Sequence, residues 1–99
     1  MTYPLTIQPE AEADLAAAFC WYEEQRSGLG LEFLDCVEEV WKRISSTPEL
    51  HAATYRGVRQ ALVRRFPYVV CYLFESNEVE VIAVFHGHRD PKSWQSRVQ

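Results

Sequence analysis

The sequence lacks the features that mark several classes of protein. Its 99 residues contain no apolar stretch near the roughly 18 residues that a membrane-spanning helix needs. The first ten residues contain neither a basic nor an apolar segment, so we expect no signal peptide. "SGLG" (27–30) lacks the glycine spacing and the preceding strand of a phosphate-binding loop. These absences argue against a membrane protein, a secreted protein and a nucleotide-dependent enzyme.

Cysteine and lysine are also scarce. The three cysteines, Cys20, Cys36 and Cys71, are an odd number without a CxxC or zinc-type spacing. They lie in apolar segments, so we expect reduced core thiols in a cytoplasmic protein. Lys42 and Lys92 are the two lysines, and the other eight basic residues are arginines. Arginine suits forked contacts with carboxylates and phosphates, which favours a partner that carries such groups.

What the sequence does contain is typical of one packed domain over residues 1–99. The hydrophobic fraction is 47% and the aromatic fraction 13%, enough for a well-filled core. The charge is unevenly spread. Residues 1–50 hold three basic and ten acidic side chains, a net charge of −7, whereas residues 51–99 hold seven basic and four acidic ones, a net charge of +3. This asymmetry predicts an arginine-rich surface in the second half that attracts an acidic partner.

The first half has the hydrophobic period of helices. Pro9 suits a first helical position, with acidic residues after it, and predicts a helix over 9–26. "SGLG" reverses the chain, and a second amphipathic helix is predicted over 31–46, ended by "SSTP" (45–48). Two helices joined by so short a turn form an antiparallel hairpin.

Short strands surround this hairpin. Alternating side chains predict an edge strand over 3–8, and the period after Pro48 predicts strands over 58–66, 68–75 and 78–86. Asn77 suits the tight turn between the last two strands. Residues 92–97 are predicted to form a short closing helix after Asp90 and Pro91. The predicted fold is α+β, a helical hairpin on a mainly antiparallel four-stranded sheet, in the order β-α-α-β-β-β.

Strand alternation also predicts which side chains share a face. In the last strand it places Ala83 and Phe85 with Val81, and His86 and His88 on the opposite face. The predicted core residues are Phe19, Phe33, Val37, Trp41, Leu62, Val70, Val81 and Ala83.

Four segments together resemble one known family. They are "ADL" (13–15), "GLGLEFLDCVEE" (28–39), "RRFPYVVCY" (64–72) and "VFHGHRDPKSW" (84–94), with Arg97 behind the last. The combination is similar to the RelE/ParE superfamily of bacterial toxins, over almost the whole chain. The resemblance implies a small cytoplasmic toxin of a type II toxin–antitoxin pair that inhibits growth, binds a cognate antitoxin as a hetero-oligomer, and uses no cofactor.

The superfamily divides by target, and the fold does not decide between the branches. Ribosome-dependent members cut messenger RNA, whereas ParE-type members are associated with inhibition of DNA gyrase. The "HRDPKSW" ending resembles the ParE-type and plasmid-stabilisation members, and the predicted strands contain no lysine. We therefore expect action on DNA gyrase without a chemical step by this chain. An mRNA endoribonuclease and a non-toxic antitoxin-binding homologue remain the alternatives.

The candidate site residues follow from these two readings. Cleavage of RNA needs proton transfer and cations around the phosphate, for which the candidates are Arg59, Arg65, His86 and His88. The candidates for contacts with target or antitoxin are Arg59, Arg64, Arg65, Tyr72, His86, His88, Arg89, Lys92, Trp94 and Arg97.

Four expectations concern individual candidates. Arg64 and Arg65 are adjacent in a predicted strand and should face opposite sides. Trp94 is expected to anchor the closing helix in the core. His86 and His88 resemble a metal-binding pair but have no clear third ligand, so no metal is predicted. Arg89 is the expected strongest contact of a patch at the strand end.

Overall fold

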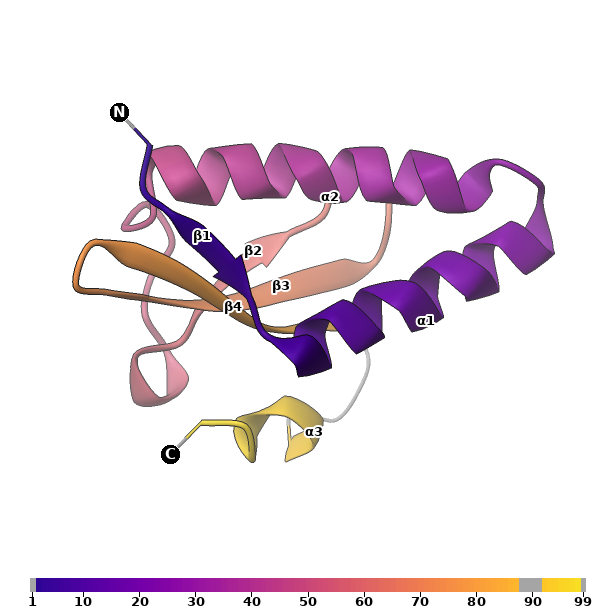
Figure 1. Ribbon diagram of the computed structural model, residues 1–99. Helices are drawn as coiled ribbons and strands as arrows, with labels where there is room; N and C mark the ends of the chain where they lie inside the picture. The colour runs from indigo at the N-terminus through magenta and orange to yellow at the C-terminus, as the bar shows by residue number, and fades with distance from the viewer. Residues whose placement is uncertain (1, 88–91, 99) are drawn as a thin grey trace.

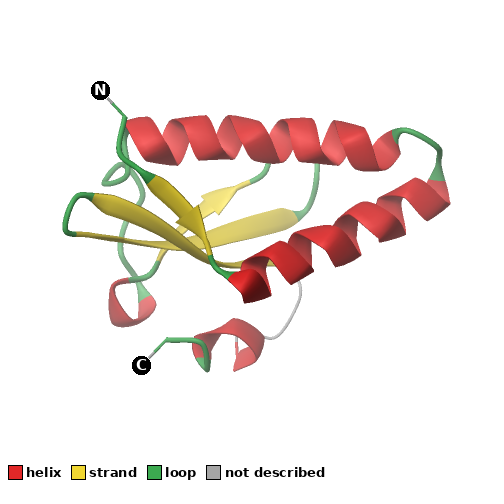
Figure 2. Cartoon of the chain, in the orientation of Figure 1, coloured by secondary structure: helices red, strands yellow, loops and turns green. Residues whose placement is uncertain are grey.

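The computed structural model describes residues 2–87 and 92–98. A hairpin of two long helices covers one face of a four-stranded sheet, and a short C-terminal helix lies near the other face (Figure 1, Figure 2). The strands are β1 (Leu5–Ile7), β2 (Arg59–Leu62), β3 (Tyr68–Glu75) and β4 (Glu78–His86). The helices are α1 (Pro9–Gln25), α2 (Leu29–Ser46), the 3-10 turn η1 (Tyr55–Gly57) and α3 (Lys92–Gln95). The predicted α+β fold and its element order are confirmed.

Local sequence explains how the hairpin begins and turns. Pro9 occupies the first turn of α1, and Glu10 and Glu12 lie near the positive end of its dipole. Gly28 has φ 90°, a left-handed conformation that a residue with a Cβ atom rarely adopts, and it reverses the chain into α2. Gly30 lets the helices approach closely, since a Cβ atom there would lie 2.8 Å from the Phe19 carbonyl oxygen.

The sheet has the strand order β1-β4-β3-β2, so the last long strand of the chain lies in the middle. β1 is a parallel edge strand beside β4, whereas β2, β3 and β4 are antiparallel. Ser76 and Asn77 both have positive φ in the β3–β4 turn, a pattern typical of a two-residue hairpin. Both β3 and β4 have the predicted bounds, and β1 has the predicted edge position.

Two buried clusters lie on the two faces of the sheet. The cluster under the hairpin includes Phe33, Val37, Val70 and Val81, all predicted as core. The cluster on the opposite face includes Ala83, Phe85 and Trp94, so the predicted roles of Ala83 and Trp94 as core residues are also confirmed. Among the described residues no helix is long and apolar enough to cross a membrane.

Three core predictions need correction. Leu62 is 70% exposed, because it ends the edge strand β2 on the face away from the helices, while Ala61 points into the core. Phe19 and Trp41 are half-buried and not fully buried, although Trp41 packs against the cluster under the hairpin. Cys36 and Cys71 are buried thiols as predicted, but Cys20 is exposed on α1.

A bulge in β4 changes which side chains face the helices, so the predicted faces of that strand are partly wrong. The register between β3 and β4 shifts at Cys71/Tyr72, so Ile82 is an extra residue in β4. Before the bulge, Val81 faces the helices. After it, Val84 does so, while Ala83 and Phe85 lie in the opposite cluster. Simple alternation therefore fails at Ile82, and His86 shares the helix-covered face with Val84.

Candidate functional site

The two adjacent arginines of the β2–β3 loop face the same helix. β2 ends at Leu62, and Arg65 has φ 74°, so strand alternation does not apply to them. The guanidinium of Arg64 donates two hydrogen bonds to the Glu39 carboxylate, at 3.0 and 2.8 Å. Arg65 donates to Glu32 at 2.9 Å, and both acceptors lie on α2. The prediction that the two arginines point to opposite sides is wrong.

These pairings neutralise charge inside the chain. Hydrogen bonds from Arg65 and Arg26 lower the pKa of Glu32 below its ordinary value, and the bonds from Arg64 do the same to the pKa of Glu39. All these side chains remain partly exposed to solvent. Arg64 and Arg65, which were predicted to belong to an open cationic surface, are thus matched by carboxylates of α2.

Arg59 and Tyr72 lie at one end of the sheet, and both donate hydrogen bonds to the loop that follows α2. Arg59 donates to the backbone carbonyl of His51 at 2.5 Å. Tyr72 is fully buried, and its hydroxyl donates to the Pro48 carbonyl at 2.7 Å. Burial raises the pKa of Tyr72, as expected for a phenol held neutral. Tyr72 therefore offers no surface to a partner, and the contacts of Arg59 hold the loop.

His86 lies at the other end of the same face. Its ring centroid lies 5.5 Å from that of Tyr68. The Tyr68 ring lies 6.0 Å from that of Tyr22, which in turn lies 5.1 Å from that of Trp21. Trp21, Tyr22, Pro67, Tyr68 and His86 line a hollow of about 430 Å³ beside the end of α1. His86 is thus part of an aromatic surface, which sequence reasoning did not predict.

The C-terminal segment is held by a tryptophan and an arginine. Trp94 is 2% exposed and stacks on Phe85, with centroids 5.9 Å apart. Arg97 donates to both carboxylate oxygens of Asp14, at 2.7 and 3.2 Å, and to the Ile82 carbonyl at 3.0 Å. The hydrogen bonds to Asp14 raise the pKa of Arg97. The ring of Trp94 and the guanidinium of Arg97 therefore both make contacts within the chain.

Asp14 is the residue of this arrangement that sequence reasoning missed. Besides Arg97, its carboxylate accepts a hydrogen bond at 3.0 Å from the Val84 backbone N–H, just after the bulge. A signal was present in the sequence, because Asp14 lies three residues after Ala11 and four before Ala18, both on the buried stripe of α1. A carboxylate beside such a stripe needs a partner, and here the bulge and Arg97 provide it.

Part of the predicted patch lies outside the described residues. His88 and Arg89 belong to residues 88–91, and the side chain of Lys92 in α3 is likewise not described. Their roles in a contact with target or antitoxin stay predictions from the sequence.

The candidate catalytic groups that are described do not converge. In the sheet, Arg59 lies opposite Tyr72, and His86 lies opposite Tyr68, which is four residues before Tyr72 in β3. This separation corresponds to about 13 Å. Arg65 is turned toward α2. Arg59, Arg65 and His86 therefore do not surround one phosphate-sized position, as cleavage of RNA would require.

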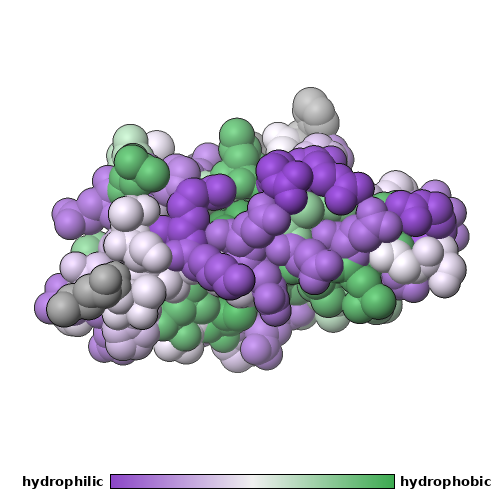
Figure 3. Space-filling view, turned by 90° about the horizontal axis from the view of Figure 1, so that it is seen from above, coloured by the Kyte–Doolittle hydropathy of each residue, from purple (hydrophilic) through white to green (hydrophobic). Residues whose placement is uncertain are grey.

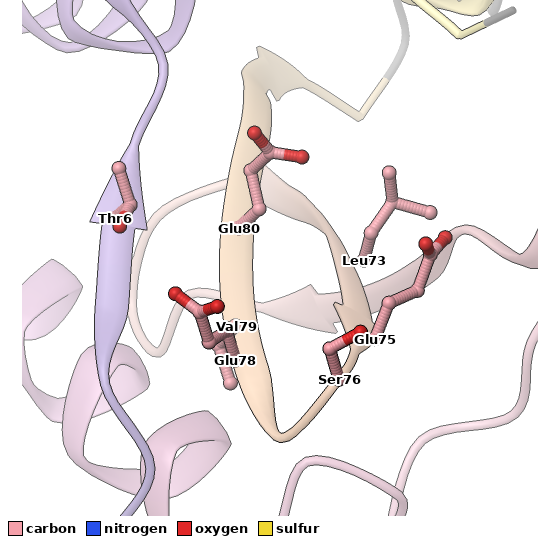
Figure 4. A pocket seen from close by; sticks show the side chains of 7 residues that line it. All are labelled: Thr6, Leu73, Glu75, Ser76, Glu78, Val79 and Glu80. Atoms are coloured by element: carbon pink, nitrogen blue, oxygen red, sulfur yellow. The ribbon is translucent and has the colours of Figure 1, made fainter.

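A second hollow, near the β3–β4 turn, is lined by acidic side chains. Its walls are Thr6, Leu73, Glu75, Ser76, Glu78, Val79 and Glu80 (Figure 4). Glu80 accepts a hydrogen bond from the side-chain amide of Gln8. Within residues 2–87 and 92–98, no three His, Cys, Asp or Glu side chains are grouped so that they could hold a metal ion. The hollow brings together none of the predicted site residues.

The fold defines the structural class of the chain. It matches solved structures of the chromosomal ParDE toxin–antitoxin system from P. aeruginosa, with a TM-score of 0.75, 19% identity, and coverage of 86% of this chain and 96% of that one. It also matches a mutant of E. coli toxin RelE in the free state, with a TM-score of 0.73, 18% identity and complete coverage of both chains. The toxin–antitoxin complex RelBE2 from Mycobacterium tuberculosis gives a TM-score of 0.63 at 22% identity, with coverage of 87% of this chain and 99% of that one. The chain therefore has the RelE/ParE fold.

Sequence comparison gives the family within that class. Residues 5–91 match the family described as the ParE toxin of the type II toxin–antitoxin system parDE, and the chain belongs to this family. Toxin ParE2 of M. tuberculosis is 29% identical over 102 residues, which cover 99% of this chain and 94% of that protein. The resemblance inferred from the sequence motifs is confirmed.

Proposed function

We propose that this ParE-family toxin inhibits bacterial growth by binding DNA gyrase, without a chemical step of its own, in the cytoplasm. The observation that carries the proposal is the separation of Arg59, Arg65 and His86, each of which has contacts inside the chain. A nuclease needs such groups to converge, whereas an inhibitor that acts through protein contacts does not. The similarity to Toxin ParE2 over almost the whole chain supports the same branch.

The neutralising partner in this proposal is an antitoxin encoded beside the chain. The structural neighbours include a ParDE system and a RelBE2 complex, and this supports a stable hetero-oligomer. The test is expression of the toxin gene and its neighbouring gene from one plasmid, with an affinity tag on the toxin. Copurification of the neighbouring product, and relief of growth inhibition by it, are expected. Failure of the product to bind, together with normal growth when the toxin is expressed alone, would contradict the toxin function.

The target is tested by two parallel assays of the purified toxin. Supercoiling by purified gyrase is expected to fall as toxin is added, while messenger RNA on translating ribosomes stays intact. His86→Ala is a useful comparison, because loss of a proton-transfer group would abolish cleavage if the chain were a RelE-like nuclease. Codon-positioned cuts with unaffected supercoiling would overturn the gyrase proposal. Absence of both effects, with antitoxin binding retained, would indicate a non-toxic homologue.

A further inference from the structure

The loop between α2 and β2, residues 47–58, is attached to the sheet at few points. Pro48 and Val58 are buried, whereas most of the residues between them are exposed. The hydrogen bonds from Tyr72 and Arg59 to carbonyls of the loop join it to the sheet. A segment that buries so little apolar surface opens at a lower free-energy cost than the core does.

His51 is the half-buried side chain in the middle of this loop. Its ring meets that of Tyr72 edge-on, with centroids 6.3 Å apart. Its Nε2 atom is buried and has no hydrogen-bond partner. The backbone carbonyl of the same residue accepts the bond from Arg59. Both the side chain and the main chain of His51 therefore hold the loop against the sheet.

Two arginines act on the His51 ring. Hydrophilic side chains run along the side of α2 that faces away from the sheet (Figure 3), but Arg43 in the last turn reaches β2 and donates to the Leu62 carbonyl at 2.9 Å. The Nε atom of Arg43 is also buried without a partner. Within the described part of the chain, neither Arg43 nor Arg59 forms an ion pair. Glu39 interacts with the charge of Arg43, but its carboxylate is bound by Arg64.

We propose that His51 is a pH-sensitive switch of this loop: the neutral imidazole keeps residues 47–58 closed on the sheet, and the imidazolium releases them. The neutral ring adds no charge beside the two guanidiniums. A protonated ring would add a third positive charge there, and its buried Nε2 would become a charged donor without an acceptor. Both changes are costly away from water, and opening of the loop removes both because it exposes the ring.

The direction of the pH effect follows from the surroundings of the ring. Burial and the charges of Arg43 and Arg59 lower the pKa of His51 below its ordinary value of 6.5. Tyr72 also faces the ring, and because burial raises its pKa it stays neutral in this range. The closed loop therefore binds the proton less readily than the open loop. Its stability is complete above pH 6.5 and declines as the pH falls from there through the lowered pKa of His51.

Opening of the loop changes what the sheet offers to other molecules. In the closed form Ala53 forms an antiparallel bridge with Arg59, so the loop covers part of the outer edge of β2. Release would leave backbone groups of this edge strand unpaired, and unpaired edges bind extended segments. The switch therefore makes access to one edge of the sheet depend on pH. It is independent of the target proposed above.

Hydrogen exchange of the whole chain, measured by mass spectrometry, tests the switch. Protection factors for residues 47–58 are corrected for the intrinsic effect of pH and compared at about pH 7.5 and about pH 5.5, on either side of the ordinary histidine pKa. We expect them to fall by about threefold or more at the lower pH. The β3–β4 turn is the internal control, because Glu75 and Glu78 ionise at lower pH and its protection should change little.

Three variants assign the effect to His51. His51→Gln keeps a polar side chain that gains no proton, so the loss of protection should disappear. His86→Gln is the matched control, because His86 lies at the other end of β3, and it should retain the loss. Arg43→Met removes one of the two charges, so the loss should become smaller. NMR titration of the His51 ring should then give a higher pKa than in the wild type.

Each other outcome would overturn the switch. If the loop loses the same protection in His51→Gln, another group controls it. If His51 titrates at or above its ordinary pKa, or if the loop keeps its protection while the ring is protonated, the ring does not hold the loop closed. The NMR titrations of the wild type and Arg43→Met decide even if His51→Gln is unstable in thermal melting. None of these results bears on growth inhibition or antitoxin binding, so the proposed function is tested separately.

Discussion

α1 and α2 pack on the same sheet, but they differ in the residues that they bury and in those that they expose to solvent. α2 buries a continuous stripe of Gly30, Phe33, Cys36, Val37, Val40 and Ile44 and presents charged residues outward. Two of those charges, Glu32 and Glu39, are matched by arginines from the β2–β3 loop. α1 buries only Ala11, Ala18 and Tyr22, and its outer side carries alanines, Cys20 and Trp21.

The difference indicates two kinds of surface. The contacts of α2 are supplied by this chain, because its apolar side is buried and two carboxylates on its polar side are paired with arginines. α1 is attached through Ala11, Ala18, Tyr22 and the Asp14–Arg97 pair, and its outer side also carries apolar residues. Substitutions on the two helices should therefore differ in their effect on stability, which should be large on the inner side of α2 and small on the outer side of α1.

The largest expected effect comes from the inner side of α2. Phe33 is fully buried and contacts Tyr22, Phe66 and Tyr68. Phe33→Ala should lower the free energy of unfolding by about 3–5 kcal/mol, because it removes apolar contact and leaves a cavity. Urea denaturation followed by circular dichroism measures this. A loss below about 1 kcal/mol would mean that α2 does not depend on this stripe.

The next effect concerns the polar attachment of α1. Asp14→Ala would remove the acceptor of the Val84 N–H and the carboxylate partner of the Arg97 guanidinium. We expect a loss of about 1.5–3 kcal/mol, since these are partly buried hydrogen bonds to a charged group. A double-mutant cycle with Arg97→Ala measures the coupling between the two side chains. Additive effects would show that the pair contributes no energy of its own.

The exposed pairs of α2 should matter less and should respond to acid. The pKa values of Glu32 and Glu39 are lowered in the folded chain, so their contribution to stability is present above the ordinary value of 4.5 and is lost as the pH falls below it. Arg64→Ala with Arg65→Ala should lower the melting temperature less than Asp14→Ala does. It should also flatten the decline in stability below pH 4.5. An unchanged acid profile would contradict this.

The smallest effect on stability is expected on the outer side of α1. Trp21→Ala removes a side chain that is 54% exposed, so the free energy of unfolding should change by no more than about 0.5 kcal/mol. The same urea measurement tests it. A loss as large as that of Phe33→Ala would show that Trp21 completes the core and would remove the contrast between the two helices.

The sequence predicted most of the fold because hydrophobic period and turn residues act locally. Pro9, Gly28 and Asn77 each mark a boundary that the structure confirms. The predicted strand over 58–66 was too long, because the chain leaves the sheet after Leu62 to place two arginines against α2. Such a departure depends on a partner more than twenty residues away, and no local pattern reports it.

The candidate site was less predictable for the same reason. One extra residue at Ile82 moves Val84 and His86 to the face under the helices, and alternation in the sequence continues without a sign of it. The pairing of Arg97 with Asp14 joins segments 83 residues apart and lies at that bulge, where Arg97 also contacts the Ile82 carbonyl. Charge counts similarly predicted a cationic surface, since composition does not show which charges meet within the fold.

The strand order also bears on when the protein can fold during its synthesis. β4 is the last long strand to be translated, yet it lies between β1 and β3. A nascent chain that ends at Asn77 has β1 without a neighbour and β3 with one edge open. Pairing between such distant segments is slow and has to wait for the later one. The sheet is therefore completed only after Glu78–His86 has left the ribosome, and no shorter translation product carries the finished fold.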